Sequence, residues 1–236
     1  MIYRDAKIKI YFGGVQDDID KLADAIPREA PLVADAKFNR ISELLAAEHL
    51  AFLNQTHSDH GLIVKDRIPA FDHDGDFLIA AKNKIGIGIL SADCLPIAMY
   101  DPKNHVAAIV HAGWKGSLAG VAQNAMKAMQ QEFGTQANDL QVFFGPSANV
   151  ECYQVSADFS NNLTGCSYSN QVFKKIGDSH YFDLPLFNAL QLQMAGVPED
   201  AISREYNFCT MCDDRFFSSR RLNGIPSRQA TIVVLA

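Results

Sequence analysis

The sequence predicts an α+β fold with mixed or antiparallel sheets, and two observations favour it over a doubly wound parallel sheet. Four short apolar runs follow one another with no helical segment between them, at residues 77–81, 85–90, 95–100 and 106–110. Gly, Asp or Pro lies at or near their ends, a pattern typical of strands buried on both faces. A parallel sheet would instead need helices between successive strands.

The other elements follow from the spacing of apolar residues. Residues 7–12 alternate polar and apolar side chains like a strand, and residues 39–50 carry apolar residues at roughly helical spacing. A helix is predicted from Ser117 to Phe133, because apolar residues recur on one face there and Gly134 follows.

The last third of the chain predicts three more elements. Residues 140–144 are a further buried strand. A helix begins after Asp183, with Pro185 in its first turn, and ends before Gly196. Residues 228–235 close the chain as a strand.

Length and composition indicate a soluble globular protein, which we expect to form one domain over residues 1–236. Of the 236 residues, 48% are hydrophobic and 20% are charged, and the net charge is -6. This charge argues against a nucleic-acid binder, which needs a concentrated basic surface. No segment approaches the roughly 20 consecutive apolar residues of a membrane span.

The amino terminus and the cysteines predict a cytoplasmic protein. The first twelve residues lack the apolar block of a signal peptide, and the five cysteines are an odd number. Reduced thiols are therefore expected, without a disulfide framework. Cys152 and Cys166 are expected to pack in the interior.

Three residues that can bind a metal stand near the ends of apolar runs. They are His57, Cys94 and His111, a ligand set that suits zinc and leaves a fourth position for water or substrate. Other interpretations stay open at this point. Cys94 and His111 could form a thiolate–imidazolium pair without metal, and copper also accepts these ligands. Asp93 could orient a histidine or cap a turn.

An ordered set of motifs identifies a resemblance that covers about residues 39–236. The motifs are QTH at 55–57, SADC at 91–94, HAGWKG at 111–116, GPSA at 145–148, CY at 152–153, CT at 209–210 and FFSSRR at 216–221. Together they resemble the YfiH family, also called the laccase-domain or polyphenol-oxidase family, which includes the human protein FAMIN. Asn39, Arg40 and the pair at 183–184 fit the same pattern.

The resemblance implies a fold, a cofactor and an activity. The implied fold is a layered α/β/β/α sandwich related to the deamidase domain of a cytotoxic factor. The implied zinc ligands are His57, Cys94 and His111. The implied reactions are phosphorolysis of adenosine, inosine and S-methyl-5'-thioadenosine, together with adenosine deamination. The expected partners are thus a small nucleoside and phosphate, with no nucleic acid and no membrane, while the oligomeric state stays open.

Two departures from the family pattern bear on these expectations. Family members usually carry an arginine just before the segment that reads Gly13-Gly14 here, and this chain has none there. If that arginine normally meets phosphate, phosphorolysis is affected more than the metal site. The usual QVHG is also altered, and His60 becomes an alternative ligand three residues after His57.

The remaining candidate residues surround the metal ligands in the motifs. Asp93 is a plausible proton shuttle beside Cys94. Substrate binding is assigned to Asn39, Arg40, Trp114, Lys115, Arg220 and Arg221. Trp114 can stack on a purine or simply pack, and Lys115 can meet phosphate or stay solvated. One of Arg220 and Arg221 is expected to bind phosphate through its planar guanidinium group, and the other to form a salt bridge that holds the carboxy-terminal strand. Which arginine has which role stays open at this point.

The sequence also contains a second cysteine motif, and three other functions are compatible with its residues. The spacing Cys209-x-x-Cys212 is compatible with half a zinc site or a redox pair, but it is a weak signal without further ligands, and we expect Cys209 to line the cleft and Cys212 to have no role. A copper phenol oxidase usually needs paired His-x-His motifs, which seven scattered histidines do not supply. A metal-free Cys–His hydrolase or deamidase is the second alternative, and a non-enzymatic metal-binding or interaction protein is the third.

Overall fold

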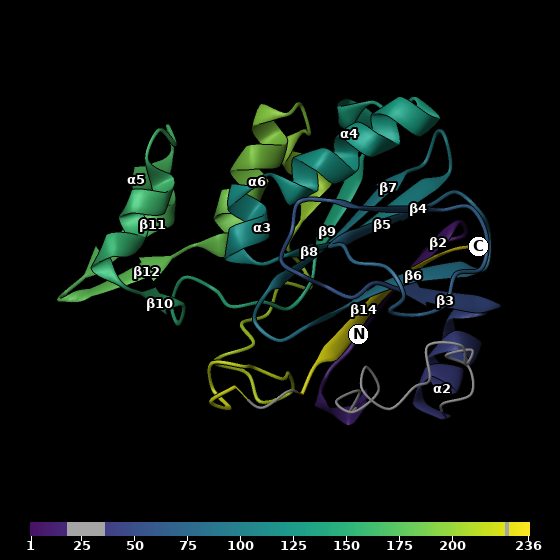
Figure 1. The fold of residues 1–236 in the computed structure, drawn as a ribbon, viewed down its shortest axis with the longest axis horizontal. Helices are drawn as coiled ribbons and strands as arrows, with labels where there is room; N and C mark the ends of the chain where they lie inside the picture. Colours follow the sequence, from purple (N-terminus) through teal and green to yellow (C-terminus); the bar gives the residue numbers. More distant parts are fainter. Residues whose placement is uncertain (18–35, 225–226) are drawn as a thin grey trace.

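The computed structural model describes residues 1–17, 36–224 and 227–236. Two mixed sheets pack face to face, and helices cover the outer face of each, so the layers run α/β/β/α (Figure 1). The predicted α+β class, the mixed sheets and the layered sandwich are confirmed.

The larger sheet has six strands in the order β13-β9-β7-β8-β5-β4. Its central strands β9, β7, β8 and β5 are antiparallel neighbours, while β13 pairs parallel with β9 and β4 pairs parallel with β5. The bounds are β4 Gly61–Val64, β5 Phe77–Ala80, β7 Leu95–Asp101, β8 Val106–Ala112, β9 Gln141–Phe144 and β13 Ile202–Ser203.

The second sheet has five strands in the order β1-β2-β14-β6-β3. Only the pair β3 and β6 is parallel among its described strands. The bounds are β1 Ile2–Arg4, β2 Ile8–Phe12, β3 His49–Phe52, β6 Ile85–Ser91 and β14 Gln229–Leu235. A small third sheet, β10-β12-β11, comprises Gln154–Val155, Ser179–Phe182 and Phe173–Ile176.

Alternating side chains along the strands build separate apolar layers. In β7, Leu95, Ile97 and Met99 face the helices, whereas Ala98 and Tyr100 face the other sheet. All these side chains are buried, because both faces of the strand are covered. This explains the unbroken apolar runs in the sequence.

Five α-helices lie within the described ranges: α2 Ala36–Leu45, α3 Trp114–Leu118, α4 Val121–Phe133, α5 Ser169–Val172 and α6 Leu184–Met194. Helix α2 packs on the five-stranded sheet, and α4 and α6 pack on the six-stranded sheet (Figure 1). Asp183 caps α6 as predicted, because its Oδ1 accepts from the Leu186 amide at 2.9 Å. No helix in the described ranges is long and apolar enough to cross a membrane.

Two helix predictions were wrong in their bounds. The helix predicted from Ser117 begins at Trp114 and is interrupted by Gly120, whose φ of 85° is a left-handed conformation that glycine adopts easily. The helix predicted over 39–50 ends at Leu45. Leu50 belongs instead to β3, where it is buried against α2.

Candidate active site

The sheets bring His57, Cys94 and His111 together. Because β3 and β6 are parallel, the loop after β3, with His57, and the turn after β6, with Cys94, lie at the same end of their sheet. The chain passes from Cys94 directly into β7, whose Pro96 pairs with His111 in β8. The ligand atoms of the three residues all lie within 4.8 Å of one another. The convergence predicted for the trio is therefore present.

The carboxylate of Asp76 accepts hydrogen bonds from two members of the trio, His57 and His111. This residue was not identified from the sequence. It is fully buried directly before β5, and its Oδ1 accepts from His111 Nδ1 at 2.7 Å. The same carboxylate accepts from the amides of Thr56, His57 and Ser58 and from the Ser58 hydroxyl. A carboxylate behind a histidine fixes its tautomer and turns Nε2 toward a metal.

The backbone around the trio has little freedom. His57 and Asp93 have φ values of 59° and 87°, a region that residues other than glycine rarely occupy. At Gly113 an added Cβ would lie 2.8 Å from His57 Cδ2 and 2.9 Å from Cys94 Sγ. The glycine of the HAGWKG motif is thus required for space beside the trio.

In the metal-free site, Cys94 and His111 form a charged pair. Burial raises the pKa of Cys94, but the positive charge and hydrogen bonds of His111 and His57 outweigh burial and bring it to about 6. Burial lowers the pKa of His111, but the Cys94 thiolate and Asp76 outweigh it and raise that pKa to about 9. Cys94 is therefore a thiolate at neutral pH, the form that binds metals.

The donor set fits a zinc ion. Two imidazole nitrogens and one thiolate are zinc ligands, and Cys94 Sγ lies 3.7 Å from His57 Nε2, a spacing that one shared ion can bridge. Asp76 supplies the partner that metal-binding histidines usually have. His60, the alternative ligand, lies outside the trio with its side chain 61% exposed.

The trio lines a pocket of about 580 Å³, a volume typical of small-molecule sites. The lining residues are Leu53, Asn54, Gln55, His57, Phe71, Leu90, Ser91, Ala92, Asp93, Cys94, His111, Trp114, Tyr153, Leu184, Ser219, Arg220 and Arg228. Among them are aromatic rings, two guanidinium groups and a single carboxylate, that of Asp93.

Asp93 is braced by the carboxy-terminal loop. Its Oδ1 accepts from the Thr210 hydroxyl at 2.7 Å, and its Oδ2 accepts from the Arg220 amide at 2.8 Å. These bonds tie the turn that carries Cys94 to the segment that carries Arg220. Its role as a proton shuttle stays a prediction.

The two adjacent arginines have different surroundings. Arg221 donates to the backbone carbonyls of Thr210, Asp213 and Phe216, so it holds the loop together and does not line the pocket. Arg220 does line it, with its guanidinium 5.2 Å from the centroid of the Tyr153 ring. Arg228 lines the pocket too, although no motif drew attention to it.

Two other predicted substrate residues lie side by side on α3. Trp114 lines the pocket and also packs edge-on against Phe159, with ring centroids 5.5 Å apart. Lys115 is exposed and lies outside the lining, with its Nζ 5.6 Å from the centroid of the Trp114 ring.

Asn39 and Arg40 lie apart from the pocket. Both are exposed on α2, and Arg40 borders a smaller hollow together with Met1 and Tyr11. The structure thus does not bring these two residues to the trio.

The expectation of reduced, unpaired thiols was wrong at one pair. Cys152 and Cys212, which are 60 residues apart, form a disulfide, and Cys209 is a free thiol beside them. The pairing depends on contacts between two loops, which residue spacing does not reveal. Cys166 packs against the core as expected.

Comparisons with known proteins agree with this architecture. A family model described as multi-copper polyphenol oxidoreductase laccase matches residues 28–236. A purine nucleoside phosphorylase of Bacteroides thetaiotaomicron is 30% identical over 192 residues, covering 76% of this chain and 70% of the relative. An adenosine deaminase, RL5, from an unknown prokaryotic organism is 29% identical over 215 residues, covering 85% and 81%. The crystal structure of YfiH from Bacillus licheniformis has a TM-score of 0.76 at 27% identity, covering 85% of this chain and 80% of that one.

Proposed function

The chain belongs to the multi-copper polyphenol oxidoreductase laccase family, and from this premise we propose that it is a zinc-dependent purine nucleoside phosphorylase that also deaminates adenosine. The observation that carries the proposal is that the His57–Cys94–His111 trio and two guanidinium groups line the same pocket. Relatives named purine nucleoside phosphorylase and adenosine deaminase support the same chemistry.

His57, Cys94 and His111 would hold the zinc ion. When bound, zinc supplies a Lewis acid that polarises an oxygen of water or phosphate. Asp76 keeps His111 in the tautomer that presents Nε2, and it fixes the amide of His57. Both reactions are hydrolytic or phosphorolytic, so they need no redox-active ion, and zinc suits them better than copper.

The walls of the pocket suit a nucleoside and a phosphate. The aromatic faces of Trp114 and Tyr153 accept a purine ring. Burial raises the pKa of Tyr153 to about 12, so its phenol stays protonated and can donate a hydrogen bond. Arg220 and Arg228 offer planar forks for phosphate, so phosphorolysis need not depend on the arginine missing before Gly13.

Asp93 is the proposed proton shuttle, because it supplies the only carboxylate among the described residues that line the pocket. In deamination, water adds to C6 of adenine while its proton passes to Asp93, and Asp93 returns the proton to the departing ammonia. In phosphorolysis, an oxygen of hydrogen phosphate attacks the anomeric carbon as the bond to the purine nitrogen breaks, and the proton of the phosphate passes to that nitrogen, which gives ribose 1-phosphate and the free base. Arg220 and Arg228 hold that phosphate.

A metal-free thiol hydrolase is the second candidate, and the lowered pKa of Cys94 favours it. A thiolate beside His111 is also the arrangement of a nucleophilic cysteine. The two candidates differ in whether Cys94 is bound to an ion or free to attack carbon.

Product analysis tests the proposal. Purified protein is assayed for bound metal and incubated with adenosine, with and without phosphate. We expect adenine and ribose 1-phosphate when phosphate is present, and inosine and ammonia when it is absent. In protein that keeps the Cys152–Cys212 disulfide, Cys94→Ala should lose zinc and turnover together, whereas Cys166→Ala, at a half-buried thiol outside the pocket, should keep both. Full turnover by metal-free Cys94→Ala would contradict the proposal.

A further inference from the structure

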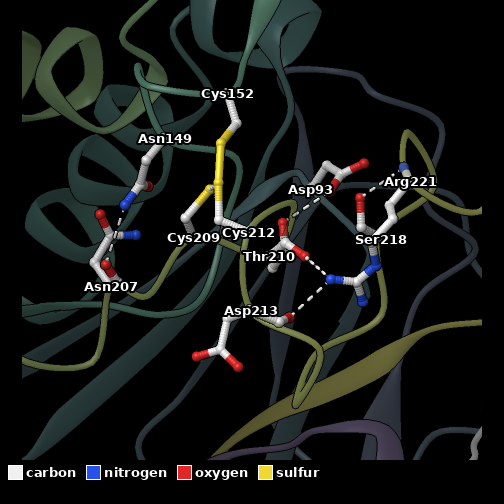
Figure 2. The surroundings of a disulfide bond; sticks show 10 residues. All are labelled: Asp93, Asn149, Cys152, Asn207, Cys209, Thr210, Cys212, Asp213, Ser218 and Arg221. Carbon is white, nitrogen blue, oxygen red and sulfur yellow. Dashed lines mark hydrogen bonds between the residues drawn. A yellow bond between two sulfur atoms is a disulfide. The ribbon is translucent and has the colours of Figure 1, made fainter.

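A second group of metal-binding side chains lies beside the pocket. The sulfur atoms of Cys152, Cys209 and Cys212 all lie within 4.8 Å of one another, and we call these residues the three-cysteine cluster. Figure 2 shows the Cys209 thiol next to the disulfide between the other two. The proposed reaction uses none of these residues.

Backbone hydrogen bonds hold the two loops of the cluster in place. The Ser147 amide donates to the Phe208 carbonyl at 3.0 Å, and the Thr210 amide donates back to the Ser147 carbonyl at 2.9 Å. The side-chain amide of Asn207 donates to the Gly145 carbonyl at 2.7 Å. The loops are therefore fixed to each other independently of any bond between sulfurs.

Tight turns within the loops present all three sulfurs on one side. Cys152 closes a turn in which its amide donates to the Asn149 carbonyl at 3.0 Å. The amides of Cys212 and Asp213 donate to the Cys209 carbonyl at 3.3 and 3.0 Å, so residues 209–213 curl around. Both cysteines of the C-x-x-C motif thus face Cys152 (Figure 2).

The spacing of the cluster matches a thiolate metal site. C-x-x-C is a spacing typical of zinc ligands, and the structure places a third possible ligand, Cys152, beside the motif. Cys209 Sγ and Cys212 Sγ are 3.5 Å apart. Thiolates on one tetrahedral zinc lie about 3.8 Å apart, given Zn–S distances of about 2.3 Å. The Cα atoms of Cys152 and Cys212 are 7.0 Å apart, just beyond the usual span of disulfides and within reach of a shared ion.

We propose that Cys152, Cys209 and Cys212 form a second zinc site when the protein is reduced. Reduction breaks the Cys152–Cys212 bond: a dithiol reductant gives two electrons and two protons, its own sulfurs join in a disulfide, and two protein thiols result. The three thiols release their protons as zinc binds. Cys212 is exposed, so water completes the fourth position.

The site would connect two walls of the pocket. Cys152 directly precedes Tyr153, which lines the pocket, and Thr210 lies between the other two cysteines and donates to Asp93. Figure 2 shows the hydrogen bond from Thr210 to Asp93, so an ion on the cluster would fix the loop that braces Asp93. This inference does not rest on the proposed nucleoside chemistry.

Zinc stoichiometry in reduced protein tests the inference. The full chain is reduced with excess dithiol without oxygen, loaded with Zn²⁺, desalted and analysed for zinc per chain. We expect two zinc ions in the wild-type protein, one in Cys209→Ser and one in Cys94→Ala. A wild-type protein that binds one zinc ion, which Cys209→Ser loses and Cys94→Ala keeps, would support the three-cysteine cluster and contradict the proposed catalytic zinc site. One zinc in the wild-type protein, unchanged by Cys209→Ser, would overturn the inference.

Thiol protection gives a readout that does not depend on how the variants fold. In the reduced wild-type protein, Zn²⁺ should slow alkylation of all three cluster cysteines at least tenfold, as read by peptide mass spectrometry. Cys166, the matched control, should react at the same rate with and without Zn²⁺. Cluster cysteines that alkylate equally fast with Zn²⁺ present would rule out the site.

Discussion

Replacing Asp76 by Asn should weaken both the metal site and the fold, because this buried carboxylate accepts from several groups at once. Its Oδ1 accepts hydrogen bonds from His111 Nδ1 and the His57 amide, and its Oδ2 accepts from the amides of Thr56 and Ser58. Asn keeps one acceptor oxygen and turns an NH2 group toward the remaining donors. The amides of Thr56 and Ser58 then lose their acceptor, and because both residues are only partly covered, each loss costs less than the roughly 1–3 kcal/mol of a fully buried donor. The free energy of unfolding should fall by about 1–3 kcal/mol.

Zinc affinity should fall as well, by about 10- to 100-fold, which is the usual effect of losing the carboxylate behind a metal-binding histidine. This corresponds to about 1.4–2.7 kcal/mol of binding free energy. The assays are competition for zinc with a chromophoric chelator and urea unfolding of the metal-free protein. Asp101→Asn is the matched control, because Asp101 is equally buried and accepts from Lys103 and Asn104 outside the pocket. It should lose stability and keep its zinc affinity. Asp76→Asn with zinc affinity within threefold of wild type would refute this reasoning.

The pH dependence provides a second check on Asp76. Burial raises the pKa of this carboxyl, but hydrogen bonds from His111 and Ser58 outweigh burial and hold it well below its usual range. A depressed pKa adds stability above the unfolded value of about 3.9, and this contribution is lost as the pH falls toward the folded pKa. The stability gap between wild type and Asp76→Asn should therefore narrow below about pH 4. A gap that stays constant from pH 7 to pH 3 would contradict the assignment.

Three further predictions concern the same pocket. Gly113→Ala should lower zinc affinity at least tenfold in the chelator competition, because the added Cβ would press on His57 and Cys94. An unchanged affinity would show that the site does not need a glycine at this position. In metal-free protein, alkylation of Cys94 should have its midpoint near pH 6 rather than about 8.5, and His111→Asn should move the midpoint above pH 8. An ordinary midpoint in the unsubstituted protein would argue against the charged pair. Arg220→Ala should raise KM for phosphate about tenfold or more in initial-rate assays, while KM for adenosine should change less than threefold. An equal rise in both KM values would contradict the assignment of Arg220 to phosphate binding.

Much of the sandwich could be predicted from the sequence because its central strands are buried on both faces. The runs at 77–81, 85–90, 95–100 and 106–110 became β5 to β8 with bounds that differ by at most two residues. Short or half-exposed strands such as β4 and β11 gave no comparable signal, since their apolar residues neither alternate regularly nor form a long run. The break at Gly120 was missed because helical apolar spacing continues across it.

The metal trio could be predicted only through the family motifs, since its members are too far apart in sequence for a local ligand pattern. Asp76 was not identified from the sequence, because an acidic residue after Gly75 resembles an ordinary loop residue. The one feature of the sequence that could have indicated it is its position directly before an entirely apolar strand. The Cys152–Cys212 pair and the wall position of Arg228 depend on how loops meet, which only the folded chain shows.

The central claim is that a zinc ion on His57, Cys94 and His111 is required for nucleoside turnover, and a chelator titration of adenosine turnover tests it most directly. Turnover should fall in step with zinc content as the chelator removes the ion, return when Zn²⁺ is added back, and return poorly with Cu²⁺. Cys94 should alkylate slowly before the chelator is added and quickly afterwards. Turnover that survives complete zinc removal, with a rapidly reacting Cys94 from the start, would contradict the account.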